Sequence, residues 1–366
     1  MGAYDSSKRI FYYDVLRALA IILIITSHIC REFAKEWPVH SLKFIASAGW
    51  MDIAVLGVPI FLMLSGALLL NREYTLSDFF KRRYTRILIP FIFWALLLPI
   101  AKMIFLGEEV SFENYIDLFF LKQYWFVWML IGVYLLIPIL NSFFREYGLD
   151  GALFTVVIWF IFMILFKEFN GGFLGTFEEV HPYGWQQVMA GYIGYLPLGY
   201  YLSHKDFKLD EKKICIVTAI VFVIFTLINF NHTITDTHTS STLVYYGYRR
   251  IVSTVQAICL FLFARYFSQM CENHKGGIKN KIYSFFKDTR LSNAILSLSV
   301  CSYGVYLIHY FWFYPINYLE SIGINVYVLN PVIFVPIVVL FVAGMGWLTI
   351  WILSKVPILK HISGAH

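Results

Sequence analysis

The sequence predicts an all-α, polytopic membrane bundle of about ten transmembrane helices, with both termini on the cytoplasmic side. Of its 366 residues, 59% are hydrophobic and 14% are charged, and the mean hydropathy is +0.67. An ordinary soluble domain has roughly a quarter of its residues charged. The aromatic share of 19% also suits a membrane protein, because Trp and Tyr gather at the headgroup level. Apolar runs recur along the chain, so we expect a single membrane-embedded domain over residues 1–366.

The individual spans follow from the apolar runs. A helix that crosses a bilayer needs about 20 predominantly apolar residues. The sequence places such helices at 10–30, 50–70, 86–106, 123–143, 151–167, 188–203, 212–230, 249–268, 296–314 and 331–354. The fifth and sixth runs are short, so their boundaries are the least defined. The first run is followed by no small-residue cleavage site, and we expect it to be retained as a helix.

The distribution of Lys and Arg predicts the orientation. With the amino terminus inside, most of the 29 Lys and Arg residues fall on the inner side, notably in 71–86 and 275–290. The alternate loops 168–187 and 230–248 contain none. Because cytoplasmic loops are enriched in Lys and Arg, this asymmetry predicts a multi-pass protein of the cell membrane with cytoplasmic termini. The basic residues form no single basic face, so membrane lipid is an expected partner and nucleic acid is not.

Cysteine usage argues against cross-links and metal binding. The five cysteines are scattered and show no CxxC spacing, and several lie within apolar runs. An odd, scattered count suits neither a disulfide framework nor a zinc site. No set of metal ligands is visible elsewhere, so we expect no metal.

Ionisable side chains at bilayer depth are costly and are therefore functional candidates. In the first span, Arg17 and His28 are nearly three helical turns apart, so they share one face about 16 Å apart along the axis. Asp14 lies one turn before Arg17, close enough to neutralise it. His309, in the ninth span, is expected at a depth similar to that of His28. Interhelical hydrogen bonding by the histidines, and a structural pair of Asp14 and Arg17, are the alternatives to a functional role.

The inner end of the second span and the loop after it carry small and basic residues. Ser65 and Gly66 allow two helices to approach closely, which is an alternative to a binding role. The loop contains Arg82, Arg83 and Arg86. This cluster is either an orientation signal that binds anionic lipid or a site for a phosphate-bearing cytosolic ligand, since Arg presents a planar fork to phosphate oxygens. The residues alone leave both interpretations open.

An aromatic run opens the fourth span at its outer end. It begins with Tyr124 and Trp125. Such a run is typical of the aromatic belt at a membrane surface, and it also suits a platform for a sugar ring. The residues by themselves favour the belt.

In their order along the chain, these motifs resemble those of integral-membrane acyltransferase family three, whose members O-acylate cell-envelope glycans and related acceptors. The hallmark of that family, Arg, ten residues and then His in the first helix, is matched by Arg17 and His28. Further similar segments are Val58–Leu70 with Ser65-Gly66, Arg83-Tyr84-Thr85-Arg86, Trp125-Phe126 with Tyr134 and Pro138, Leu196–Leu202, and Ser302–His309. Ala67 departs from the family, which often has an aromatic residue there.

The resemblance implies an acyl-CoA-dependent membrane O-acyltransferase. It would move an acyl group, expected to be acetyl, from cytosolic acetyl-CoA to a hydroxyl of an envelope glycan or a lipid-linked sugar. His28 and Arg17 are the expected catalytic residues. His28 would act as general base or carry the acyl group covalently. Arg17 would contact the pantetheine or a phosphate. The expected donor-binding residues are Arg82, Arg83, Arg86, Asp14 and Ser65, and the expected acceptor-binding residues are His309, Tyr303, Trp125 and Tyr124. A passage should link the basic inner mouth with His28.

The alternative is a polytopic exporter of a glycan or small molecule without acyl-transfer chemistry. Ten helices with buried polar groups also suit a transport path. Against this, the sequence has no clear inverted repeat and no pair of Gly/Pro-broken helices in matching halves. A membrane scaffold is a third possibility, and it would tolerate the loss of both His28 and Arg17.

Overall fold

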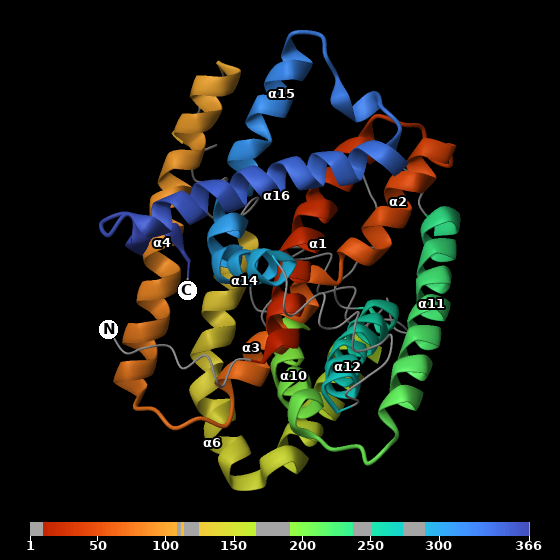
Figure 1. The fold of residues 1–366 in the computed structure, drawn as a ribbon, viewed down its shortest axis with the longest axis vertical. Coiled ribbons are helices and arrows are strands. Elements are labelled where there is room, and N and C mark those ends of the chain that lie inside the picture. The colour runs from red at the N-terminus through yellow and green to blue at the C-terminus, as the bar shows by residue number, and fades with distance from the viewer. Residues whose placement is uncertain are drawn as a thin grey trace.

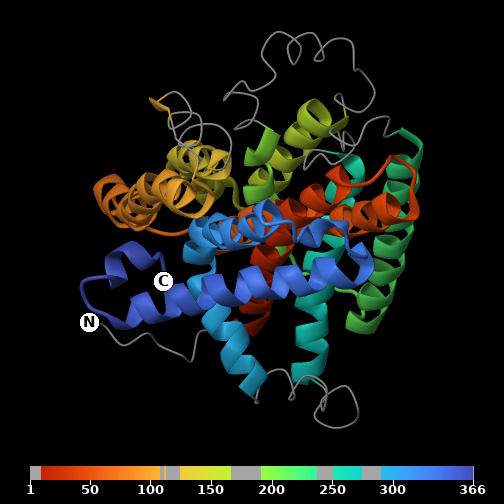
Figure 2. The same cartoon turned by 90° about the horizontal axis from the view of Figure 1, so that it is seen from above.

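The computed structural model describes residues 10–107, 111–112, 124–165, 191–236, 250–273 and 290–365. Across these residues the regular secondary structure is entirely helical, which confirms the all-α prediction. Eight of the described helical stretches are long and apolar enough to cross a membrane. The helices cross at varied angles around the central helix α1 (Phe11–Lys35), as Figures 1 and 2 show. The described residues thus form a polytopic membrane bundle.

The remaining helices follow in chain order. They are α2 (Leu42–Ala54), α3 (Gly57–Leu69), α4 (Leu76–Leu106), α6 (Trp125–Trp159), the π-helix η3 (Phe160–Leu165), α10 (Tyr195–His204), α11 (Glu211–Asp236), α12 (Ile251–Asn273), α14 (Arg290–Ile308), the 3-10 helix η4 (His309–Trp312), α15 (Tyr314–Ser321), the 3-10 helix η5 (Val326–Val328), α16 (Pro331–Lys355) and α17 (Lys360–Ser363). The predicted second span corresponds to α2 and α3 together. The tenth corresponds to α16 almost residue for residue.

The predicted fourth and fifth spans are continuous in the structure. They form one stretch of 41 residues, Trp125–Leu165, which includes α6 and η3. Gly148 divides it, with φ 59° and ψ −138°. A side chain disfavours this backbone conformation, so a glycine here lets the chain bend between the two spans. The predicted sixth span, 188–203, lies partly outside the described residues, and its described part ends in the ten-residue helix α10.

The basic segment before the third span is helical, so the prediction of a loop there is wrong. Helix α4 begins at Leu76, ten residues before the predicted start of the span at residue 86. The Thr75 side chain accepts a hydrogen bond from the backbone N–H of Asp78 at 3.2 Å. Threonine at the N-cap and an acid in the first turn both stabilise a helix start. The rigid first turns of α4 therefore present the basic side chains.

The predicted ninth span is broken near its end. α14 stops at Ile308, four residues of 3-10 helix begin at His309, and α15 follows from Tyr314. Pro315 lies at the start of α15. A proline inside a continuous helix lacks the N–H for one hydrogen bond and collides with the carbonyl four residues earlier. The break places His309 at a junction between two helices.

Helix α3 packs backbone to backbone against both α1 and α10. A Cβ atom added to Gly66 would lie 1.9 Å from the Leu196 carbonyl oxygen, and one added to Gly199 would lie 1.9 Å from the Met63 carbonyl oxygen. On the α1 side, a Cβ at Gly57 would lie 2.7 Å from the Ala20 carbonyl oxygen. Small residues permit such contacts in membrane proteins, so the packing role considered for Gly66 is present.

A buried acid that sequence reasoning missed connects α2 with α11. Asp52 is 0% exposed, and its Oδ1 accepts hydrogen bonds from Asn229 Nδ2 at 3.1 Å and from the Thr233 hydroxyl at 2.9 Å. Among the described residues, its second oxygen has no hydrogen-bond partner. Asp52 lies inside the predicted second span. A charged residue within such an apolar run is the sequence feature that could have identified it.

The close packing of α3 yields a stability prediction. Gly66→Ala should destabilise the protein by about 1–3 kcal/mol, because the new methyl group collides with backbone atoms rather than with a movable side chain. The measurement is the thermal unfolding midpoint of the protein in detergent. Gly344→Ala is the matched control in α16, since a Cβ there meets nothing within 4 Å. Equal midpoints for the two variants would contradict the proposed contact.

Candidate active site

A basic cavity lies between α1, α3, α4, α6, α14 and the segment that follows α16. Its volume is about 690 Å³, within the range of roughly 300–1,000 Å³ usual for small-molecule sites. Among its described lining residues are five cations and no Asp or Glu. The cations are Arg17, Arg72, Arg83, Arg86 and Lys360. A site of this composition favours an anionic ligand.

The five cations come from four separate parts of the chain. Arg17 lies in the second turn of α1, and Arg83 and Arg86 lie one turn apart on α4. Arg72 follows α3, where the Asn141 side chain from α6 accepts from its backbone N–H at 3.1 Å and donates to its carbonyl oxygen. These two hydrogen bonds fix the backbone of Arg72. The side chain of Arg72 therefore extends from a fixed point at the cavity.

The predicted donor-binding residues divide into those that line the cavity and those that do not. Arg83, Arg86 and Ser65 line it, as does Arg17. Arg82 does not, and it is exposed on α4. Successive residues of a helix point about 100° apart, so neighbours in sequence cannot all face one cavity.

Asp14 reaches the cavity wall through a second side chain. It is 4% exposed, and its Oδ1 accepts a hydrogen bond from the Ser299 hydroxyl at 2.6 Å. Ser299 lies on α14 and lines the cavity. Asp14 therefore connects α1 to α14 behind the cavity.

Hydroxyl groups also line the cavity. Ser65 Oγ donates to the Phe61 carbonyl oxygen at 3.0 Å and lies 3.4 Å from the Tyr134 hydroxyl. The Tyr303 hydroxyl donates to the Ile87 carbonyl oxygen at 2.9 Å. Ser65, Tyr134 and Tyr303 all line the cavity, so the site also offers polar contacts without charge.

Tyr74, between α3 and α4, lies near the basic residues of the cavity. Burial raises the pKa of Tyr74, and the positive charge of Arg83 partly offsets this rise. A tyrosine phenol is already protonated at neutral pH, and this upward shift of its pKa leaves it so. Tyr74 therefore adds no negative charge beside Arg83.

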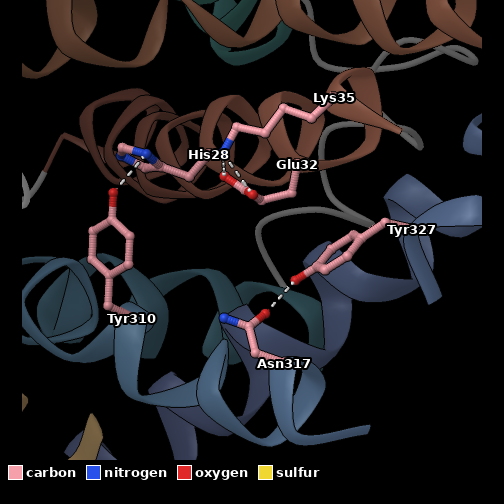
Figure 3. A network of polar contacts seen from close by, with 6 residues as sticks. All are labelled: His28, Glu32, Lys35, Tyr310, Asn317 and Tyr327. Carbon is pink, nitrogen blue, oxygen red and sulfur yellow. Dashed lines mark hydrogen bonds and ion pairs between the residues drawn. The ribbon is translucent and has the colours of Figure 1, made fainter. Parts of the chain in front are cut away.

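The two histidines within spans face each other at the junction of α14 and α15. The ring centroids of His28 and His309 are 5.2 Å apart. His28 Nδ1 and the Tyr310 hydroxyl are 2.8 Å apart, which Figure 3 shows as a contact between α1 and η4. His28 and His309 thus lie next to each other, in agreement with the prediction that they lie at a similar depth.

The hydrogen bonds of His309 define which of its nitrogens carries the proton. Its Nδ1 contacts the Tyr306 carbonyl oxygen at 2.5 Å. A carbonyl can only accept, so Nδ1 is the donor, and the neutral imidazole then has a lone pair on Nε2. Among the described residues, this Nε2 is buried and has no hydrogen-bond partner. His309 therefore presents an unoccupied proton acceptor.

An aromatic layer separates the cavity from the two histidines. Phe61 lines the cavity and contacts Phe126 edge to face, with ring centroids 5.9 Å apart. Phe126 contacts Tyr306 at 5.2 Å, and Tyr306 contacts His309 at 5.6 Å. Neither histidine lines the cavity, so the prediction of an open passage is not met among the described residues.

Tyr124 and Trp125 have packing roles at the start of α6. Tyr124 is 1% exposed, its hydroxyl donates to the Leu307 carbonyl oxygen at 3.0 Å, and its ring contacts Phe91. Trp125 is half-buried and contacts Tyr192, with ring centroids 5.7 Å apart. Tyr124 is thus too enclosed to act as a platform for a sugar ring in this structure.

The end of α1 beyond His28 carries both acids and bases, and Lys35 forms an ion pair with Glu32 at 2.8 Å. The Tyr327 hydroxyl donates to Asn317 Oδ1 at 3.1 Å, as seen in Figure 3. Burial raises the pKa of Tyr327, and the carboxylates of Glu32, Glu320 and Glu36 raise it further. The region beyond His28 therefore carries charges of both signs, whereas the described residues that line the cavity include cations and no acid.

Several cavity residues were absent from the sequence-based set. Arg72, Tyr134 and Lys360 line the cavity, and Tyr310 contacts His28. Arg72 and Lys360 were visible only as inner-side charges, and Tyr134 only as part of a motif. The only sequence feature that could have pointed to Tyr310 is its position next to His309.

The comparison with protein families identifies the chain. A model of acyltransferase family three, described as an acyltransferase domain, matches residues 10–350. Neither the comparison with curated proteins nor that with solved structures found a match. The matched range includes Arg17, His28, the basic start of α4 and His309. Because the match spans nearly the whole chain and the described helices suit a bilayer, the chain belongs to acyltransferase family three and is a multi-pass membrane acyltransferase.

Proposed function

We propose that this acyltransferase takes an acyl group, in particular acetyl, from cytosolic acyl-CoA and transfers it to a hydroxyl of an envelope glycan or a lipid-linked sugar. The cavity with five cations and no acid among its described lining residues carries this proposal. Coenzyme A bears a 3′-phosphate and a diphosphate, and arginines bind phosphate oxygens through paired N–H groups. The positive-inside rule assigns the basic end of the bundle to the cytoplasm, where acyl-CoA is made.

The geometry of α1 supports a donor that extends from the cavity toward the histidines. Arg17 lines the cavity, and His28 lies about 16 Å further along the same helix face. The phosphopantetheine arm of coenzyme A is a long, flexible chain that ends in the thioester. Phosphates held by Arg83 and Arg86 would leave this arm to pass Arg17 and the aromatic layer. We expect Phe126 and Tyr306 to move aside when the donor binds.

The paired imidazoles suit proton transfer during acyl transfer. The acceptor hydroxyl would attack the thioester carbonyl carbon while Nε2 of His309 or a nitrogen of His28 takes the hydroxyl proton. The C–S bond then breaks, and the thiolate of coenzyme A receives that proton, so an ester and free coenzyme A result. Histidine titrates near neutral pH and suits both proton acceptance and donation. Covalent transfer through His28 fits the same position, because the imidazole itself can be the nucleophile.

The histidines yield a test of the reaction. His28→Ala should lower acyl transfer about 100-fold or more, the usual contribution of a general base, while the protein still elutes as a folded species. Tyr310→Phe removes only the hydroxyl next to His28 and should cost about 10-fold, the effect of one lost hydrogen bond. Release of free thiol from acetyl-CoA, measured with an envelope glycan fraction present as acceptor, reports the transfer. Full activity of His28→Ala would rule out the assigned role.

The basic cluster yields a test of the donor. Arg83→Ala and Arg86→Ala should each weaken coenzyme A binding about 10-fold or more, since each loses a charged hydrogen bond to phosphate. Arg82→Ala is the matched control, because this neighbouring side chain is exposed and does not line the cavity. Calorimetry of coenzyme A binding provides the measurement. An equal loss in the Arg82 variant would point to general surface charge instead of a specific site.

The acceptor requires a test in cells. Mass spectrometry should find acylated envelope glycans with the intact protein and not with His28→Ala. A wild-type protein that neither binds coenzyme A nor releases thiol from acetyl-CoA would reject the donor proposal and favour an exporter.

A further inference from the structure

The segment that follows α16 lies against the cavity. We call residues 356–365 the strap. Its Lys360, Gly364 and Ala365 line the cavity, although the family match ends at residue 350. The family resemblance therefore does not account for these residues. In Figure 1 the end of α16 and α17 lies beside α4, the helix that carries Arg83 and Arg86.

The strap is anchored by backbone contacts on two sides. Trp94 Nε1 on α4 donates to the Ile362 carbonyl oxygen at 2.8 Å. A Cβ added to Gly304 on α14 would lie 2.0 Å from the Ser363 carbonyl oxygen, so the two backbones touch. Ser363 is 0% exposed and Ala365 is 6% exposed. Burial and fixed hydrogen bonds hold the strap in one position rather than leaving it as a loose tail.

Gly364, whose backbone has a left-handed conformation, directs the end of the strap toward the cavity. Gly364 has φ +68°, and a Cβ there would lie 3.1 Å from the Gly304 backbone. A residue with a side chain would be strained in this conformation and would also crowd α14. The neighbour of Gly304, Tyr303, lines the same cavity, so the strap completes a wall formed by α14.

Lys360 lies nearer the cavity mouth than Arg17. Its side chain is exposed, whereas Arg17 is half-buried. Within the described residues, Lys360 makes no ion pair, and no acid lines the cavity beside it. A lysine ammonium near the surface of a basic cavity is available to a phosphate group.

We infer that the strap is part of the donor site and that Lys360 binds a phosphate at the nucleotide end of acyl-CoA. This inference rests on the proposed function. The exposed Lys360 meets the part of the donor that stays near the mouth, the phosphorylated nucleotide, while Arg17 meets the part that goes deeper. A phosphate of an anionic lipid headgroup has the same chemistry, and the experiment separates the two sources.

The test compares two ligands that differ only at the nucleotide end. Lys360→Gln should weaken binding of coenzyme A about tenfold and leave binding of 4′-phosphopantetheine, which lacks the nucleotide, unchanged. Lys355→Gln is the matched control, since Lys355 is exposed on the same side of the bundle but does not line the cavity. Calorimetry with the full chain in phosphatidylcholine nanodiscs supplies both affinities.

Each other outcome has a definite meaning. Unchanged coenzyme A binding by Lys360→Gln, next to normal binding by the wild type, would overturn the role of the strap and leave the proposed function intact. Equal weakening of both ligands, or an equal loss in Lys355→Gln, would overturn the assignment to the nucleotide end. A loss seen only in nanodiscs that contain phosphatidylglycerol would assign Lys360 to lipid headgroups and overturn the inference.

A second variant tests the anchor of the strap. Trp94→Phe removes the hydrogen bond to Ile362 and keeps an aromatic ring in place. It should weaken coenzyme A binding while leaving 4′-phosphopantetheine binding unchanged, because it loosens Lys360 and no deeper residue. Identical affinities for coenzyme A in Trp94→Phe and the wild type would contradict an anchored strap.

Discussion

The arrangement of the site depends on the close contact of α3 with its two neighbours. Glycines at 57, 66 and 199 bring the backbone of α3 against those of α1 and α10. Helices in lipid gain little from burying apolar surface against one another, so tight van der Waals packing of small residues must hold them together. With α3 fixed in this way, Ser65 and Arg17 face the same space from adjacent helices. The close packing at these glycines thus sets the position of α3, and with it the position of the cavity wall that α3 contributes.

Charge is distributed differently at the two ends of α1. Five cations line the cavity near its first turns, whereas its last turns carry charges of both signs, including the ion pair of Lys35 with Glu32. The histidines lie between these ends, behind an aromatic layer that includes Phe126 and Tyr306. Among the described residues, this layer thus separates the basic cavity from the two imidazoles.

The junction of α14 and α15 explains how a membrane helix can present a reactive group. In an unbroken helix the backbone polar groups are satisfied internally. The break near Pro315 leaves the Tyr306 carbonyl oxygen to accept from His309 Nδ1. Backbone geometry thereby decides that Nε2 is the acceptor. The same junction brings Tyr310 to His28.

Sequence reasoning identified individual site residues better than it predicted which of them lie together. The family motifs identified Arg17, His28, Arg83, Arg86 and Ser65, and the structure gathers four of these at one cavity. The residues that sequence reasoning missed, such as Lys360 and Arg72, lie outside those motifs or carry charges that also serve orientation. Arg82 stays a prediction: it does not line the cavity, because the basic segment is a helix and a helix turns adjacent side chains in different directions.

The sequence by itself determined the membrane class, most of the spans and the spacing of Arg17 and His28. These are local properties, since hydropathy and helical period depend on residues that are close in the chain. Only the tertiary structure decided that His28 meets His309 and Tyr310, and that the strap reaches Trp94 and Gly304. Such contacts join residues far apart in the chain, and they depend on how helices bend and which small residues let them touch.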